Sequence, residues 1–597
     1  MLTGCYLNIY LIKVLNPTDH QLKIMSQLNI FLVVCCYLTF VQLATAQYQT
    51  IALTGEIAPG TSANFTEFSQ VNINNSGNVA FRASSDGGNG VWVDTQGQLE
   101  LIVQSGSPAT PIGNGVEIAN IFDTRLNDSG VLSFSSGLSG NGVENGNNSA
   151  VWTAGSGGLT LLVREGDPAP GIPGNFGFLN DPIFNNSGES AFPQRLVGLS
   201  FSNDDTIWSK GGGSGLTLIA REGSPAPGTP AGVDFFGFLG GVDLNDLGQS
   251  AFRARIVGPG IGSFNDGGIW RGDTSGISPV VLAGDPAPGT DDGVVFLGSG
   301  IGGTDGGFSP PILNNFGQVA FFARLIGSSP IGNNRGIWAE EDDLELSLIV
   351  RQGDPAPGIK NVSFSMTIEN LLFNDAGQVA FIDQLSGAAF GENRAIWLHS
   401  PDSGFSLVAR EGNPAPGTSA GVNFDDFADD FGIIDVMAMN NLGQVAFRSD
   451  LTGAVNGSND RGIWATDLSG NLKLVVRTGD LLDVNEDPEI EDLRTISGVS
   501  FVTGQRGRQS GFNDSGQLAF VAFFTDGTRG VFVSDVVAID DFIIGDVNGD
   551  GEIGFLDISP FISRLSSSSF QSEADVNQDG EVNFLDISPF IVLLSGA

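Results

Sequence analysis

The chain has 597 residues, among them 85 Gly, 27 Pro and 43 Phe, and only 16% of its residues are charged. It is too long for one compact core, and its composition favours short buried strands joined by tight turns over long amphipathic helices. The net charge of −41 excludes nucleic acids and anionic membranes as partners, because such polyanions would be repelled, and favours divalent cations.

Residues 1–46 are expected to be a signal peptide. The uncharged apolar run 30–46 ends in Ala44-Thr45-Ala46, the small-x-small pattern of cleavage sites, which predicts cleavage before Gln47. Met25 is an alternative start, since it would open a signal of ordinary length. The alternative interpretation is a transmembrane anchor, although the run would barely span a bilayer. We therefore expect a secreted or extracellular protein, possible cell-surface attachment included, that is not an integral membrane protein after cleavage.

Removal of this segment would also remove reactive side chains from the mature chain. All three cysteines, Cys5, Cys35 and Cys36, lie in it, so the mature chain would have neither disulfides nor a thiol nucleophile. His20 would be lost as well, which leaves His399 alone. A catalytic triad would have to use that histidine, and a His-rich zinc site is excluded.

The rest of the chain is dominated by eight copies of one unit of about 63 residues. The pattern Asn-x-x-Gly-x-x-(Ala/Ser)-Phe begins at Asn74, Asn127, Asn185, Asn245, Asn314, Asn374, Asn440 and Asn513. A short segment after each copy ends in an aromatic residue: Trp92, Trp152, Trp208, Trp270, Trp338, Trp397, Trp464 or Phe532. An alternating strand follows, and it leads into a turn such as Gly166-Asp167-Pro168-Ala169-Pro170-Gly171.

The local chemistry of the unit predicts a turn that feeds a strand. In the copy at 440–447, the side chain of Asn440 can bond its own backbone ahead, and Gly443 can adopt positive φ. The Pro-rich turn cannot continue a strand, because proline lacks the amide donor. Each unit should therefore contain three or four antiparallel strands.

These units must bury their apolar faces against one another. The spacing between copies varies, which a propeller tolerates better than a solenoid. Residues 49–55 are similar to the strand that closes other units, so they could complete the last blade and close a ring. We predict a mainly β fold with an eight-bladed β-propeller over residues 47–540; linked β modules or a solenoid are the alternatives.

The repeats resemble a family of bacterial tandem-repeat proteins that is named for the NxxGxxAF motif and carries varied C-terminal anchors. The resemblance covers about residues 48–540. It implies export and an extracellular or surface location, and it implies no activity.

The C-terminal residues 541–597 are expected to form a small, helical calcium-binding domain. The segment 546–557 is repeated 29 residues later as 575–586, and both segments have oxygen-bearing side chains at positions 1, 3, 5 and 12 with Gly at position 6. This is the EF-hand-like spacing of a calcium loop, and calcium is favoured over magnesium, which holds its water tightly. The predicted ligands are Asp546, Asn548, Asp550, Glu552 and Asp557 in the first loop, and Asp575, Asn577, Asp579, Glu581 and Asp586 in the second.

The two loops, each followed by a short apolar segment (558–565 and 587–594), resemble a type I dockerin domain. The same ten residues match the two ligand sets of that family. The resemblance implies a cohesin partner, but positions 10 and 11 are Phe555-Leu556 and Phe584-Leu585, where cellulosomal dockerins often have polar residues. An unknown surface receptor and an intramolecular cap are therefore alternatives to a cohesin.

Other candidate residues have simpler explanations. The Asn, Gly, Phe and Trp positions recur in every unit, which favours an architectural role over a catalytic one. Five arginines before the Pro-rich turns could pair with Asp167, Asp354 or Asp480 or bind a substrate carboxylate; they are Arg164, Arg221, Arg351, Arg410 and Arg477. Acidic clusters at 425–430 and 340–343 could hold paired carboxylates for sugar hydrolysis, but solvated loops are favoured. We expect His399 to be exposed at the end of a strand.

The sequence favours a non-enzymatic binding, adhesion or scaffold protein that presents loops to a glycan or surface partner and is attached through its tail. The alternative is a secreted polysaccharide-active enzyme, a hydrolase or lyase, on the propeller. An enzyme should have one repeat with unique carboxylates near the axis of the ring, and a scaffold should have none.

Overall fold

A computed structural model of the chain describes most of residues 48–537 and scattered positions in the C-terminal segment. Within 48–537 it leaves out 156, 180–181, 212–214, 300–306, 328–332, 369, 428–435, 486–489 and 505–509. After 537 it describes 558, 561–562, 565, 576, 582 and 587–594. The chain divides into the units Met1–Tyr48 and Gln49–Ala597. Within the part that the structure describes, no helix combines the length and the apolar character needed to cross a membrane.

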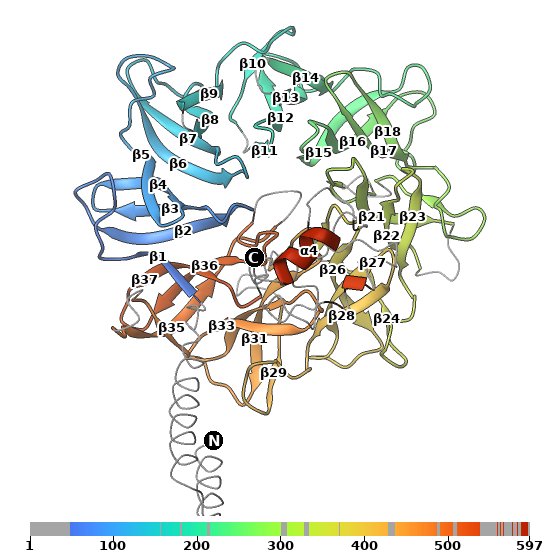
Figure 1. The fold of residues 1–597 in the computed structure, drawn as a ribbon. Helices are drawn as coiled ribbons and strands as arrows, with labels where there is room; N and C mark the ends of the chain where they lie inside the picture. Colours follow the sequence, from blue (N-terminus) through green and yellow to red (C-terminus); the bar gives the residue numbers. More distant parts are fainter. Residues whose placement is uncertain are drawn as a thin grey trace, which may run out of the picture. The chain divides into compact units, whose positions relative to one another are not determined.

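Eight antiparallel sheets are arranged around a central axis, and each sheet is one blade (Figure 1). The strands of blades 1 and 2 are β2 (Phe65–Ile73), β3 (Val79–Ser85), β4 (Gly88–Thr95), β5 (Gln98–Gln104), β6 (Val116–Leu126), β7 (Leu132–Gly140), β8 (Ser149–Gly155) and β9 (Gly158–Arg164). The strands of blades 3 and 4 are β10 (Asn175–Phe176), β11 (Ile183–Phe184), β12 (Ser190–Val197), β13 (Asp205–Lys210), β14 (Leu216–Arg221), β15 (Asp234–Leu244), β16 (Ser250–Val257), β17 (Gly267–Asp273) and β18 (Gly276–Leu282).

The second half of the ring repeats the same order. The strands of blades 5 and 6 are β19 (Val295–Phe296), β20 (Ile312–Leu313), β21 (Val319–Ile326), β22 (Arg335–Glu340), β23 (Leu346–Arg351), β24 (Ser363–Phe364), β25 (Asn370–Phe373), β26 (Val379–Ser386), β27 (Arg394–Ser400) and β28 (Gly404–Arg410). The strands of blade 7 are β29 (Val422–Phe424), β30 (Met437–Met439), β31 (Val445–Gly453), β32 (Arg461–Thr466) and β33 (Leu472–Arg477). Three or four strands were predicted for each unit, and these blades have four strand positions. In blades 3, 5, 6 and 7 the first strand consists of two short pieces that both pair with the second strand.

Blade 8 joins the two ends of the propeller. It contains β34 (Leu481–Asp483), β35 (Leu493–Ser500), β36 (Leu518–Phe524), β37 (Arg529–Ser534) and β1 (Tyr48–Leu53). β1 pairs with β37, so a strand from the start of the ring supplies the outer strand of the last blade. Just beyond β1, the Thr54 N–H donates to the carbonyl oxygen of Arg529 at 2.9 Å. The eight-bladed, closed arrangement predicted from the sequence is confirmed.

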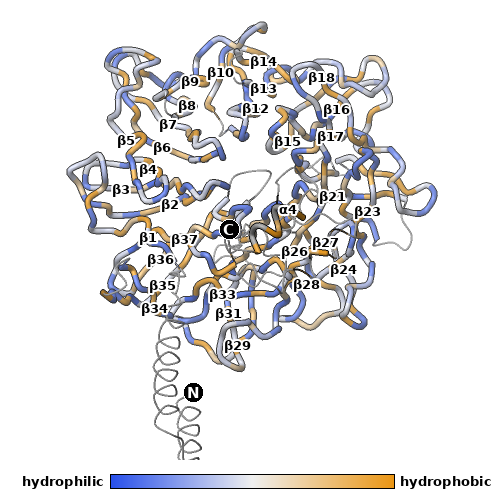
Figure 2. Tube along the Cα trace, in the orientation of Figure 1, coloured by the Kyte–Doolittle hydropathy of each residue, from blue (hydrophilic) through white to orange (hydrophobic). Residues whose placement is uncertain are grey.

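The hydrophobic core lies between neighbouring blades. Orange, hydrophobic stretches follow the strands in Figure 2, while hydrophilic residues gather in the connecting loops. Because each blade is covered on both faces, Val445, Ala446 and Phe447 are all at 0% exposure, although alternate residues of a strand point to opposite faces. At the seam, Val521 and Val531 of blade 8 share a cluster with Trp92 of blade 1. Burial of apolar surface in each such cluster holds adjacent blades together.

The last residue of every repeat motif is a Phe that lies directly opposite an aromatic residue of the next strand. The pairs are Phe81–Trp92, Phe134–Trp152, Phe192–Trp208, Phe252–Trp270, Phe321–Trp338, Phe381–Trp397, Phe447–Trp464 and Phe520–Phe532. In blade 7 the two rings are stacked with centroids 6.3 Å apart. Phe424 adds an edge-to-face contact to Trp464 at 5.0 Å, a geometry that aromatic pairs prefer.

The Pro-rich turn at the start of a blade is tied to the tryptophan of that blade. The Nε1–H groups of Trp92, Trp270, Trp338 and Trp464 donate to the carbonyl oxygens of Pro59, Pro227, Pro288 and Pro416, respectively, at 3.0–3.1 Å. In these four blades the residue two before the Trp is glycine, and a Cβ at Gly462 would lie 2.8 Å from the Trp464 ring. In blade 3, where Thr206 stands at that position, the Trp208 indole donates to the Thr206 hydroxyl instead.

The C-terminal segment contains the helix α4 (Ile587–Leu594). Phe561 and Phe590 are buried, and their rings stack with centroids 3.9 Å apart. Ile558, Leu565, Val576, Val582, Ile587 and Leu594 pack against this pair. The cluster contains three pairs of positions that are 29 residues apart (558 and 587, 561 and 590, 565 and 594), so the two sequence copies share one core.

Candidate functional site

The turn at the start of each repeat motif lies between the first and second strands of a blade and faces the axis. In blade 7, Asn440 Oδ1 accepts the N–H groups of Leu442 and Gln444 at 3.2 and 2.9 Å, while the Gly443 N–H donates to the Asn440 carbonyl oxygen. Gly443 has a φ of 78°, a conformation that favours glycine. The predicted side-chain-to-backbone turn is confirmed.

The other end of the same amide joins neighbouring blades. Each motif Asn donates from Nδ2 to the backbone oxygen of the motif Asn in the next blade, at 2.8–3.2 Å. The eight bonds run 74→127→185→245→314→374→440→513→74. All eight asparagines are at most 5% exposed, and unpaired amides would be costly there. The first motif residue thus forms a closed circle of hydrogen bonds.

The second motif residue forms another circle, and its identity alternates strictly between Asn and Asp. The members are Asn75, Asp128, Asn186, Asp246, Asn315, Asp375, Asn441 and Asp514. The backbone N–H of each member donates to the side-chain Oδ1 of the next, at 2.8–3.1 Å, and the circle closes from Asp514 to Asn75. We call these eight residues the axial ring.

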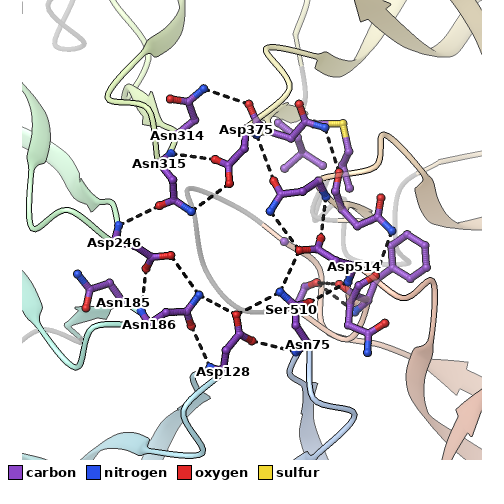
Figure 3. Close-up of a pocket in the computed structure, with 18 of the residues that line it drawn as sticks. Asn75, Asp128, Asn185, Asn186, Asp246, Asn314, Asn315, Asp375, Ser510 and Asp514 are labelled. Atoms are coloured by element: carbon purple, nitrogen blue, oxygen red, sulfur yellow. Dashed lines mark hydrogen bonds between the residues drawn. The ribbon is translucent and has the colours of Figure 1, made fainter. Parts of the chain in front are cut away.

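The alternation matches donors to acceptors within the axial ring (Figure 3). The amide of Asn75 donates to Asp128 and Asp514 on either side, at 3.1 and 2.9 Å. Asn186 bridges Asp128 and Asp246 in the same way, at 2.8 and 3.2 Å. Since a carboxylate only accepts and an amide NH2 only donates at its two hydrogens, an Asn between two Asp residues satisfies both neighbours.

The axial ring lines a cavity of ≈ 190 Å³ at the centre of the propeller. Burial raises the pKa of Asp375, and the charges of Asp246 and Asp514 add to this effect, whereas hydrogen bonds from Asn315 oppose it. Each of the four carboxylates accepts a backbone N–H from the neighbouring blade. These carboxylates are therefore held in a fixed network that links blades, which is the architectural role expected for the repeated motif.

Two family models match the chain. The first, described as a family of unknown function (DUF7453), matches residues 40–393 and 299–541, and so covers the whole propeller. The chain belongs to the DUF7453 family. The second model is the type I dockerin domain, which matches residues 544–594. The chain therefore joins a DUF7453 propeller to a type I dockerin domain.

Solved structures add similarity to propellers at low sequence identity. The β-propeller domain of the Trilobed protease from Pyrococcus furiosus has 11% identity and a TM-score of 0.35, over 70% of this chain and 98% of that one. The Dos1 propeller has 9% identity and a TM-score of 0.35, over 81% and 94%. Prolyl oligopeptidase B from Galerina marginata has 9% identity and a TM-score of 0.34, and the match spans 77% of this chain but only 56% of that one. Among curated proteins, none matches the sequence.

The predicted calcium ligands of the dockerin domain all lie outside the described residues. They are Asp546, Asn548, Asp550, Glu552, Asp557, Asp575, Asn577, Asp579, Glu581 and Asp586. Type I dockerin domains bind calcium in general, and the chemistry of these oxygen-bearing side chains fits that ion. The described apolar residues of the domain, Phe561 and Phe590 above all, supply the common core on which two such loops would be mounted.

The arginines before the Pro-rich turns of the DUF7453 propeller make a different contact from the one expected. Pairing with the aspartates of the turn was one expectation, and the positive charge of Arg164 does oppose the burial that raises the pKa of Asp167. The side-chain hydrogen bond of Arg164, however, goes from Nε to the carbonyl oxygen of Asn147, at 2.9 Å. Arg221, Arg351, Arg410 and Arg477 donate in the same way to the carbonyl oxygens of Asn203, Asn333, Glu392 and Asn459. Each arginine thus fixes the loop before the third strand, because its guanidinium group reaches a carbonyl oxygen in that loop.

Two further expectations need correction. His399 is half-buried against the Phe405 ring, 4.8 Å away, rather than exposed, and burial lowers its pKa. In the cluster 340–343, Glu340 is 5% exposed and pairs with Arg271, so it is not part of a solvated loop. In the cluster 425–430, Asp426 pairs with Arg394, and residues 428–430 lie outside the described part.

The sequence reasoning missed the axial ring and the link between glycine and tryptophan. Both leave a signal that only a comparison of all eight copies reveals: the alternation of Asn and Asp at the second motif position, and the Gly two residues before most of the tryptophans.

Proposed function

We propose that the protein is a secreted binding or scaffold module, in which the DUF7453 propeller presents loops to an extracellular partner and the dockerin domain attaches it to a larger assembly. The observation that carries the proposal is the type I dockerin match at 544–594 directly after the propeller. Dockerin domains dock onto cohesins, so a cohesin-like receptor is the first partner to test. The proposal includes cleavage of the signal peptide before Gln47, calcium in both loops and membership of the NxxGxxAF group.

The network at the axis supports a non-catalytic propeller. Catalytic carboxylates of a sugar hydrolase must reach substrate with one proton donor and one base or nucleophile. The four axial carboxylates instead accept backbone N–H groups from neighbouring blades, as described above. A glycan ligand therefore fits better on the loops at the rim than at the axis.

Cleavage of polysaccharides is the second candidate function, and one cluster favours it. Asp204, Asp205 and Glu222 of blade 3 bring three carboxylates together. However, Asp204 and Glu222 are only 4% and 5% exposed, so a polymer could not reach both of them.

The full-length protein should be incubated with a panel of polysaccharides while binding and product release are both recorded. In a second experiment, its binding to an immobilised type I cohesin should be measured with calcium and with EDTA. We expect binding of a glycan or of the cohesin without product, and loss of cohesin binding in EDTA. Product release that is abolished by a single carboxylate substitution would favour the enzyme instead.

A further inference from the structure

Three acidic side chains of blade 3 meet on the side of the propeller opposite the axial turns. Asp204 ends the loop between β12 and β13, Asp205 is the first residue of β13, and Glu222 directly follows β14. One carboxylate oxygen from each lies within 4.8 Å of one from each of the others. Two oxygens bound to one calcium ion at about 2.4 Å are at most about 4.8 Å apart, so the three groups could share an ion after small side-chain movements.

Burial makes this cluster unlike an ordinary acidic surface patch. Asp204 is 4% exposed and Glu222 is 5% exposed, whereas the Asp205 side chain is 34% exposed and opens the cluster to solvent. Within the described part of the chain, Oδ1 of Asp204 is buried and has no hydrogen-bond partner. A buried carboxylate oxygen without a partner is costly unless a cation or a proton compensates it.

The equivalent positions of other blades show how the same carboxylate is normally compensated. In blade 2, Glu165 Oε2 accepts the Ser149 hydroxyl at 3.0 Å and the Asn148 N–H at 3.2 Å. In blade 6, Glu411 Oε2 accepts the N–H groups of Asn393 and Arg394 at 3.1 and 3.0 Å.

In blade 3, Glu222 Oε2 accepts the Asp205 N–H at a longer distance, 3.5 Å. Backbone hydrogen bonds from Asp205 and Asp204 lower the pKa of Glu222, but burial outweighs them. Asp205 stands three residues before the blade's tryptophan, a position that is arginine in blades 5, 6 and 7. Blade 3 thus has a negative side chain next to its buried glutamate, where blade 6 has Arg394 next to Glu411.

Among the described residues, Arg195 forms ion pairs with the cluster. Nε of Arg195 is 3.1 Å from Asp204 Oδ2 and 3.6 Å from Asp205 Oδ1, and its side chain is 59% exposed. Three carboxylates and one guanidinium leave two negative charges, which one divalent cation would neutralise. Burial raises the pKa values of Asp205 and Glu222, and repulsion among the acids adds to this effect. Arg195 opposes the rise at Asp205, and backbone N–H groups oppose it at Glu222.

We infer that Asp204, Asp205 and Glu222 form a divalent-cation site in the propeller, separate from the loops of the dockerin domain, and that calcium is its ion. Calcium accepts six to eight oxygens in flexible geometry, so water and loop carbonyls can complete a site with three carboxylates. Magnesium requires near-ideal octahedral geometry and keeps its water, which suits a half-buried cluster less well.

Tryptophan fluorescence can separate this site from the dockerin domain, because all seven tryptophans lie between residues 92 and 464. The thermal unfolding of the full-length protein should be followed by this signal in EDTA, in 5 mM CaCl2 and in 5 mM MgCl2. We expect calcium to raise the midpoint by about 1–3 °C through its preference for the folded state, and magnesium to raise it less.

Two variants of the site and one of the tail decide the outcome. The site variants are the double variant Asp205→Asn/Glu222→Gln and the single variant Asp205→Arg, which introduces the arginine found in blades 5, 6 and 7. Both should lose the calcium-dependent shift. In EDTA both should melt at or above the wild-type midpoint, because the repulsion among the carboxylates is relieved. Asp546→Ala/Asp575→Ala in the tail should keep the shift. An absent shift in the wild type, an equal shift with magnesium, or an equal shift in Asp205→Arg would overturn the proposal.

Discussion

Asn513 and Asn74 lie 439 residues apart in sequence, yet Asn513 Nδ2 donates to the carbonyl oxygen of Asn74 at 3.0 Å. An equivalent hydrogen bond between motif asparagines links the neighbouring blades at all seven remaining junctions. The seam between blades 8 and 1 therefore has the chemistry of an ordinary blade junction. Alongside it, the Asp514 N–H donates to Asn75 Oδ1 at 2.8 Å. The alternation of Asn and Asp returns to its starting residue only when the number of blades is even, and eight satisfies this condition.

The alternation should be sensitive to charge. Asn75→Asp removes the two amide donors to Asp128 and Asp514 and places a third carboxylate between them. We expect a loss of about 1–3 kcal/mol in the free energy of unfolding at pH 7, from unsatisfied acceptors and like charges. Urea unfolding followed by tryptophan fluorescence measures it, and the loss should shrink as the pH falls and the carboxylates are protonated. Exposed Asn141→Ala is the control; equal stabilities for Asn75→Asp and this control would contradict the role of the axial ring.

The glycine before the tryptophan should tolerate no side chain. In Gly462→Ala, the new Cβ would lie 2.8 Å from the Trp464 ring and 2.9 Å from the Val476 oxygen, so the indole must move and its bond to Pro416 would weaken. Overpacking of this kind costs about 1–3 kcal/mol, and we expect that loss together with an altered emission spectrum. Gly457→Ala is the matched control, because the nearest atom to its Cβ would be 3.9 Å away. A spectrum and a stability like those of the control would refute the packing argument.

Glu411 should make stability depend on pH. Burial raises the pKa of Glu411 to about 7 from 4.5, against the effect of Arg394 and of two backbone N–H groups, while Asp426 adds to the rise. The folded state therefore binds this proton more tightly than the unfolded state. The contribution of this proton to the free energy of unfolding is fully present below about pH 4.5 and is lost as the pH rises to about 7. The difference in unfolding free energy between wild type and Glu411→Gln, measured from pH 4.5 to 8, should change over this window; two parallel profiles would exclude the effect.

Calcium removal should affect the dockerin domain first. Two acidic loops on a core as small as that of Phe561 and Phe590 should need ions to remain folded, because their carboxylates repel one another. EDTA at 25 °C should make residues 541–597 sensitive to protease and leave the tryptophan emission of the propeller unchanged. Re-addition of calcium should restore resistance. Resistance that persists in EDTA would show that the tail folds without metal.

Local chemistry was readable from single motifs, but contacts between blades were not. The roles of Asn440 and Gly443 in their turn follow from side-chain reach and backbone conformation. The sequence could not show that the second amide hydrogen bond of Asn440 goes to Asn513, because that bond exists only after the blades are placed side by side.

The same limit applies to charged residues. Arg164 was expected to pair with its sequence neighbour Asp167, but the loop at Asn147 comes closer in the folded blade. Asp204, Asp205 and Glu222 come from the two ends of a β-hairpin, and nothing in their separate sequence contexts marks them as neighbours. Only alignment of the blades reveals that Asp205 stands where blades 5, 6 and 7 have an arginine.

The closure of the ring can be tested directly at its seam. Thr54 and Arg529 lie opposite each other, with the Thr54 N–H donating to the Arg529 carbonyl and the Arg529 N–H donating to the Thr54 hydroxyl, both at 2.9 Å. The backbone hydrogen bond holds the two residues side by side, so we expect their Cα atoms to lie within the range of about 4.4–6.8 Å that disulfides span. A chain that starts at Gln47 has no other cysteine. Thr54→Cys/Arg529→Cys should form an intramolecular disulfide under mild oxidation, seen as faster migration in a non-reducing gel. The pair Thr54→Cys/Ser469→Cys should not form one. Failure of the seam pair to oxidise in folded protein would contradict a closed eight-bladed ring.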